Sequence, residues 1–178
     1  MRTTFAKARG LVALTVLLVV QVAASETYQE PADFIDEAFS YATPEAGALW
    51  ITQELIGPLE DILGHPIAFR RIRFWGQGGR TAWILEEIGK EQPITTGIVI
   101  DDGRIERVKV LVFRESRGWE VRHDFFTNQF QQASLEKDLG LDRHIDGISG
   151  ATLSVRARKK QARAALFLSQ QVVVDASP

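Results

Sequence analysis

The sequence contains no cysteine. The protein therefore forms no disulfide, binds no metal through thiolates, holds no iron–sulfur cluster, and has no cysteine for c-type haem or lipid attachment. An excess of positive charge is also missing, since 23 acidic residues stand against 21 Lys and Arg. Without the basic surface that phosphate backbones require, we expect no nucleic-acid partner. The three histidines are dispersed without metal-ligand spacing, so no metal site is predicted.

The N-terminus differs in composition from the rest of the chain. Three cations and no acid precede an apolar run at residues 11–24, and the small residues Ala23 and Ser25 supply a cleavage site. As a helix this run spans roughly 21 Å, shorter than a bilayer core of about 30 Å. We therefore expect residues 1–25 to be a secretory signal peptide, with an uncleaved N-terminal anchor as the alternative. Residues 26–178 would then form a single domain that is periplasmic or otherwise extracytoplasmic.

The first part of this domain, residues 26–66, has apolar residues at helical spacing and is predicted to be a helical subregion. Thr43 and Pro44 are typical of a helix start, as cap and first-turn proline. Pro58 is a candidate point of division into two helices. Gly64 is expected to end the region.

Strand patterns with tight turns follow the helical subregion. Asp102-Gly103 predicts a hairpin turn, and a change of alternation predicts a bulge near Glu106-Arg107. Sequential strands with short connections indicate an antiparallel β-meander. The expected fold class is α+β, with helices covering one face of the sheet and a long C-terminal helix. The expected strands are 67–75, 81–88, 94–100 and 104–113.

Small side chains and a hydroxyl come directly before that C-terminal helix, in the stretch DGISGATLS at 146–154. Ser149 is a plausible helix cap, which would leave the N–H groups of Gly150, Ala151 and Thr152 free in the first turn. Free amides and the positive end of a helix dipole favour a phosphate. The alternative is a helix cap without further function.

The same residues carry a resemblance to a known family. DGISGAT resembles the flavinylation motif of the FMN-binding domain family, which includes the C subunit of the sodium-pumping NADH:quinone oxidoreductase, the Rnf G subunit and small periplasmic flavoproteins. The resemblance extends back to about Thr81. It implies one FMN attached through its phosphate to Thr152 as a phosphoester, with Ser154 as the competing hydroxyl. The implied recognition residues are Asp146, Gly147, Ser149, Gly150 and Ala151.

The resemblance also implies how the flavin is attached and where its ring lies. A separate flavin transferase would make the bond, and Asp146 would contact its metal or orient the acceptor; the alternative is a loop residue that bonds nearby N–H groups. The loop 114–122 corresponds in position to the family loop beside the flavin. Glu115 and Gly118 match that loop in kind, and Trp119 would stack on the ring or form part of the core or rim.

Two further patterns have simple structural interpretations. The basic run from Arg156 to Arg163 is typical of one solvated helix face, although it could also meet an acidic partner or the transferase. Phe125, Phe126 and Phe130 are expected to dock a short helix onto the sheet.

The combined prediction is an extracytoplasmic electron-transfer flavoprotein with covalent FMN, which exchanges electrons with a membrane-bound donor or acceptor. No nucleophile–base pair and no nicotinamide fingerprint is visible, so no catalytic residue is assigned. Two alternatives stay open. The flavin could reduce a small acceptor such as a quinone, a ferric chelate or an organic acid, or the domain could be a non-redox binding module.

Overall fold

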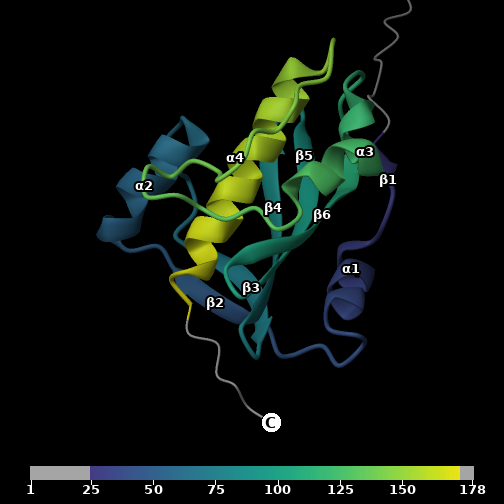
Figure 1. The fold of residues 1–178 in the computed structure, drawn as a ribbon. Coiled ribbons are helices and arrows are strands. Elements are labelled where there is room, and N and C mark those ends of the chain that lie inside the picture. Colours follow the sequence, from purple (N-terminus) through teal and green to yellow (C-terminus); the bar gives the residue numbers. More distant parts are fainter. Residues whose placement is uncertain (1–24, 173–178) are drawn as a thin grey trace, which may run out of the picture.

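The computed structural model describes residues 25–172; the expected signal peptide lies outside this range except for Ser25. A six-stranded antiparallel sheet forms the centre, in the order β1-β6-β5-β4-β3-β2 (Figure 1). The predicted α+β class is confirmed. The strands are β1 (Glu26–Thr27), β2 (Gly47–Trp50), β3 (Arg71–Gln77), β4 (Arg80–Ile88), β5 (Pro93–Asp101) and β6 (Arg104–Phe113). The helices are α1 (Pro31–Ala38), α2 (Gln53–Leu63), α3 (Asp124–Thr127) and α4 (Thr152–Ser169), with 3-10 turns η1 (Trp119–Arg122) and η2 (Asn128–Phe130).

The predicted meander corresponds to β3 through β6, each antiparallel to the next. Asp102 and Gly103 form the expected hairpin turn with φ of 46° and 74°. The predicted bulge is also confirmed, because the register shifts at Val99/Ile100 and leaves Glu106 without a direct partner. β3 starts at Arg71, four residues later than predicted, where β2 first supplies a partner strand.

Helices cover both faces of the sheet, so the prediction of a single covered face is wrong. α4 and α2 pack on one face, where the buried cluster contains Trp83 and Ile98. On the other face α1 packs on β4 and β5 (Figure 1). The ring of Phe34 in α1 occupies the space that a Cβ of Gly97 would take. β5 is buried on both faces for this reason, and its apolar residues are not confined to alternate positions.

The N-terminal subregion is only partly helical. Thr43 and Pro44 lie in a loop and start no helix; the residues that follow form the edge strand β2. Pairing with β3 overrides the helical spacing, and the absence of a side chain at Gly47 leaves room for the ring of Phe74. Pro58 lies inside α2 and does not divide it. Gly64 ends α2 with φ of 70°, as predicted.

α4 is the long C-terminal helix that the sequence predicts. Its buried face includes Val155, Ala162, Ala165 and Leu166, which pack against the sheet as expected. At about 1.5 Å per residue, its 18 residues span roughly 27 Å, so its start and its end lie near opposite ends of the sheet (Figure 1). No helix in residues 25–172 combines the length and the apolar character needed to cross a membrane.

Candidate functional site at the start of α4

The first turn of α4 has no side-chain cap. Ala151 is the N-cap residue, and the first intrahelical bond joins Val155 N–H to Ala151 O at 2.9 Å. The N–H groups of Thr152, Leu153 and Ser154 precede that bond and are left without an intrahelical acceptor. The prediction that Ser149 caps the helix is therefore wrong.

The turn before the helix explains why Ser149 does not reach the first turn. Gly150 has φ of 82°, and the N–H of Ala151 donates to Ile148 O at 3.0 Å. This tight turn places Ala151, and not Ser149, at the N-cap, and a left-handed φ of this kind favours glycine. Ser149 and Gly150 are exposed, so the surface beside the helix start consists of small groups.

The two hydroxyls that compete as acceptor have opposite environments. The residue Thr152 is exposed at the first position of α4. Ser154 is only 5% exposed and packs against Gly118. Thr152 is therefore accessible from solvent, whereas the Ser154 hydroxyl is covered by the loop.

The structure brings the loop 114–118 to the start of α4. The carboxylate of Glu115 accepts bonds from the backbone N–H groups of Lys90, Glu91 (2.7 Å) and Gln92 (3.0 Å), which fastens the loop to the β4–β5 turn. Gly118 has φ of 83°, and a Cβ at this position would collide with the Ser154 side chain and touch Ala151. Gly118 of the loop and Ala151 of the motif are thus neighbours.

Three exposed aromatic rings follow Gly118. Trp119 is 44% exposed, its ring centroid lies 5.3 Å from that of His123 at an edge-to-face angle, and His123 stacks on Phe125 at 6.0 Å. Trp119 is thus a rim residue and not a core residue. Phe125 is 64% exposed, so it is not part of the docking patch. Phe126 and Phe130, which are fully buried, form this patch.

Sequence reasoning missed this aromatic surface. It assigned His123 no role beyond the absence of metal-ligand spacing, and it predicted that Phe125 docks a short helix onto the sheet. The available signal for an aromatic surface was the occurrence of three ring-bearing residues, at positions 119, 123 and 125, in one short connection. Such a connection forms 3-10 and single-turn helices, which expose other positions than a long α-helix does.

Asp146 lies at the outer end of the motif. Its side chain is 81% exposed, and its carboxylate is 3.5 Å from His144 Nε2. The alternative role, in which this carboxylate bonds nearby N–H groups, has no such bond in the part of the chain that the structure describes. Its backbone N–H donates to Gln129 Oε1 at 2.7 Å and so fixes the loop. No group of three or more potential metal ligands occurs within residues 25–172.

The basic run in α4 does not form one solvated face. Arg158 is fully buried: its guanidinium donates to Thr96 Oγ1 and Ile94 O, and burial lowers its pKa to about 9 against the opposing effect of Glu87. Lys160 is partly buried and lies 2.9 Å from the Glu87 carboxylate. The helical spacing of the run places these two side chains toward the sheet, which composition alone does not reveal.

A comparison with protein families agrees with this geometry. Residues 89–166 match the family model described as FMN-binding domain. The match begins at the β4–β5 turn and ends in α4, so it includes both the Glu115 loop and the motif with Thr152. This match assigns residues 89–166 to the FMN-binding domain family and supports a flavin-binding protein. No curated protein and no solved structure matches the chain.

Proposed function

We propose that the protein is an extracytoplasmic electron-transfer flavoprotein with one FMN joined by a phosphoester to Thr152. The observation that carries the proposal is the uncapped start of α4 within the FMN-binding domain, where an accessible hydroxyl stands beside unpaired helix amides. Bound FMN would supply one- and two-electron redox chemistry.

The helix start fits a phosphate in three respects. The N–H groups of residues 152–154 point out of the helix without intrahelical acceptors, and the helix dipole adds positive potential there. The absence of a capping side chain keeps these donors available. The small exposed residues Ser149 and Gly150 leave the approach open.

The aromatic rings beside the helix start supply a surface for a flat heterocycle. Trp119 follows directly after Gly118, which touches the first turn of α4. With His123 and Phe125 it presents exposed ring faces and edges. Stacking of this kind adds about 1 kcal/mol per aromatic contact beyond the burial of area. In this arrangement the chain tunes the flavin through packing and charge, with Arg122 lying 5.2 Å from the Trp119 ring centroid.

Attachment requires a second protein. An ordinary threonine hydroxyl does not attack a diphosphate unaided, so a flavin transferase with a bound metal would provide FAD. The new bond joins Thr152 Oγ1 to the phosphorus of the FMN portion, the diphosphate bond breaks, and AMP leaves while a base of the transferase takes the hydroxyl proton. The exposed carboxylate of Asp146 would contact that metal or orient the acceptor.

An electron carrier agrees with the loop geometry better than a reductase does. A reductase would need a pocket with convergent charged groups, and Glu115 with Arg117 in the loop 114–122 would be such a pair. The Glu115 carboxylate is instead occupied by three backbone amides. We therefore infer that the flavin exchanges electrons with a membrane-bound redox partner outside the cytoplasm, where a covalent tether prevents loss of the cofactor.

The test is expression of the full chain with a flavin transferase in a host that exports it. The denatured protein should fluoresce as a band on a gel, and its mass should increase by FMN less one water. Thr152→Ala should abolish both signals. Ser154→Ala should retain them, since Ser154 is buried.

Two results would contradict the proposal at different points. Flavin retained in Thr152→Ala and lost in Ser154→Ala would move the attachment site. A colourless wild-type protein from a competent host would leave only non-covalent binding or a non-redox domain. Sustained turnover of purified protein with one small acceptor would replace the carrier by a reductase.

A further inference from the structure

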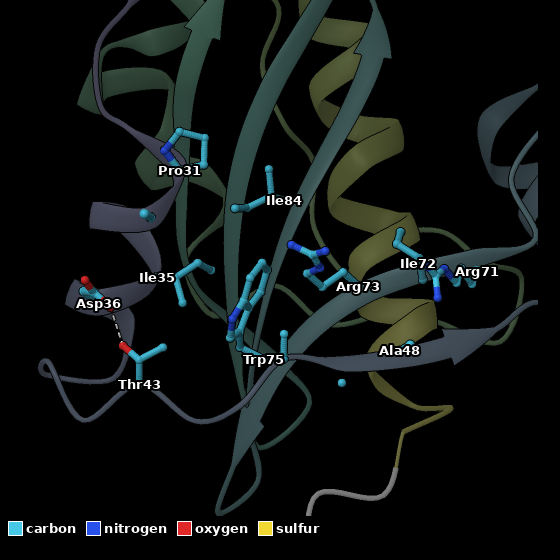
Figure 2. A pocket seen from close by; sticks show the side chains of 13 residues that line it. Pro31, Ile35, Asp36, Thr43, Ala48, Arg71, Ile72, Arg73, Trp75 and Ile84 are labelled. Atoms are coloured by element: carbon cyan, nitrogen blue, oxygen red, sulfur yellow. Dashed lines mark hydrogen bonds between the residues drawn. The ribbon is translucent and has the colours of Figure 1, made fainter.

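The sheet opens between β3 and β4. The two strands pair only at their shared turn, from Trp75↔Ala82 to Gln77↔Arg80. Before Trp75, β3 pairs with β2, whereas β4 from Trp83 onward pairs only with β5. β2 and β3 thus diverge from the rest of the sheet (Figure 2). The divergence leaves a space on both sides of β3.

The space between these elements consists of two cavities. An outer cleft of about 810 Å³ lies between α1 and the β2–β3 pair, and an inner cavity of about 280 Å³ lies between β3, α2 and α4. Their sizes fall in or near the range of small-molecule sites. Both cavities are lined by Arg71, Ile72, Arg73 and Ile84, so these four residues form the boundary between them.

The lining combines apolar surface with two guanidinium groups that have no ion-pair partner within residues 25–172. Figure 2 shows Trp75, Ile84 and Ile35 around the outer cleft, with the Arg73 side chain directed toward Trp75 and Ile84. Arg71, Arg73 and Trp75 occupy every second position of β3, so their side chains lie on the same face of the strand. Within residues 25–172 the side chains of Arg71 and Arg73 have no ion pair and no side-chain hydrogen bond; the Arg71 guanidinium lies 6.0 Å from the centroid of the Trp50 ring.

The carboxylates of the same lining are already engaged. Asp36 accepts the hydroxyl of Thr43 at 2.6 Å, as the dashed line in Figure 2 shows. Glu86 accepts the hydroxyl of Thr95 at 2.7 Å and lies 3.5 Å from Arg114. These carboxylates thus already accept hydrogen bonds, whereas the two guanidiniums have no side-chain partner within the described residues and are free to donate to a ligand. The inner cavity beyond them is mainly apolar, with Leu59, Leu63, Phe69 and Leu168 among its lining residues.

We propose that this opening binds a small amphipathic carboxylate, with the acid at Arg71 and Arg73 and the apolar body against Trp75, Ile84 and the inner cavity. Guanidinium groups recognise carboxylates through charge-assisted, often bidentate hydrogen bonds. The site is separate from the helix start at Thr152, because it lies between α1, the β2–β3 pair and the C-terminal half of α4. Of its lining residues, only Gln161 and Ala164 belong to the segment that matches the FMN-binding domain.

The experiment titrates the full mature chain with octanoate in a calorimeter, and with 1-octanol as the probe of equal chain length without a charge. We expect saturable binding of one octanoate per chain and binding of octanol at least fivefold weaker. Arg73→Gln and Arg71→Gln should each weaken octanoate binding several-fold. Both side chains are exposed and unpaired within the described residues, so these variants should remain folded, as circular dichroism would verify.

Arg70→Gln is the matched control, since Arg70 is a neighbouring exposed cation that lines neither cavity. It should bind octanoate like the wild type. Failure of the wild type to bind octanoate would overturn the proposal. Equal affinity for octanol and octanoate, or an equal loss of octanoate affinity in Arg70→Gln and Arg73→Gln, would also overturn it. Either result would show that Arg71 and Arg73 do not recognise the carboxylate group.

Discussion

The polar groups in the first turn of α4 and those in its middle differ in hydrogen bonding. At the start, three amides have no intrahelical acceptor and Thr152 is exposed. Two turns later Gln161 is 1% exposed, donates to Leu85 O and Ile94 O at 2.9 Å each, and accepts the Thr96 hydroxyl at 3.0 Å. The same helix therefore leaves donors open at one point and satisfies a buried amide completely at another.

Because of this difference, we expect the start of α4 to serve ligand binding and its middle to serve the stability of the fold. An unpaired polar group in the interior costs about 1–3 kcal/mol, and the chain itself satisfies the Gln161 amide, while Arg158 Nε is left without a partner within the described residues. Unpaired amides at an exposed helix start are solvated and cost little, and they remain available to a phosphate. Changes at the start should affect the cofactor, and changes in the middle should affect folding.

The largest expected loss of stability follows Gln161→Leu. The substitution removes three hydrogen bonds of a buried amide, including the bond that Leu85 O accepts, which should lower the free energy of unfolding by about 2–4 kcal/mol. Thr152→Ala at the helix start should change it by no more than about 0.5 kcal/mol, because Thr152 is exposed and forms no side-chain hydrogen bond in the described range. Urea denaturation of the flavin-free proteins measures both values.

Arg158→Met is the matched control inside the same network. Thr96 keeps its bond to Gln161, and Ile94 O keeps its bond from the Gln161 amide, so no partner is left without a bond. Replacing a desolvated charge by an apolar side chain of similar length is often neutral. A change within about 1 kcal/mol is expected; a loss as large as that of Gln161→Leu would show that the buried charge itself stabilises the fold.

A smaller effect is expected where the loop meets the helix start. Gly118→Ala places a methyl group against Ser154 in a residue with φ of 83°. Gly103→Ala is the control, because Gly103 has a similar φ of 74° and no atom within 4 Å of the added Cβ. Both pay about 1 kcal/mol for the left-handed backbone, and Gly118→Ala should lose about 1–2 kcal/mol more from the contact.

This pair also bears on the flavin. If the loop positions the rings beside Thr152, Gly118→Ala should lower the fraction of flavinylated protein, while Gly103→Ala, in a distant hairpin, should not. Equal flavinylation and equal stability in the two variants would mean that the contact between Gly118 and Ser154 does not position the loop.

The accuracy of the sequence predictions differs between the two halves of the chain for a physical reason. β5, β6 and their turn follow from local signals: alternation, Asp-Gly at positive φ, and a phase change at the bulge near Glu106. β2 was missed because its four residues become a strand only through pairing with β3. Local spacing carries no information about such a distant partner.

The candidate site shows the same limit. The motif predicted a helix start with Ser149 as the cap and Gly150 in the first turn, whereas α4 begins two residues later, at Thr152. Which residue caps the helix depends on the turn at Gly150, and the burial of Arg158 depends on the position of β5, so neither could be derived from the sequence. The roles of Asp146, Glu115 and Trp119 toward FMN remain predictions that the flavinylation experiments address.

The smallest expected effect lies at the edge of the buried network, at His65. This side chain is half-exposed; Nδ1 bonds Pro66 O at 2.9 Å and Nε2 bonds Glu87 at 3.0 Å. The hydrogen bond to Pro66 O and then that to Glu87 raise the pKa of His65, while burial and Lys160 oppose the shift. Protonated His65 therefore stabilises the folded chain.

The sign of the pH dependence follows from this raised pKa. The stabilisation is complete below the unfolded pKa of about 6.5 and is lost as the pH rises through the higher folded value. Melting temperatures measured from pH 5.5 to 8.5 should fall more steeply for the wild type than for His65→Gln, which keeps a donor but does not titrate. The difference should be small, because Lys160 still pairs with Glu87 when His65 is neutral. Parallel curves would show that Lys160 alone compensates Glu87 and that protonation of His65 adds no stability.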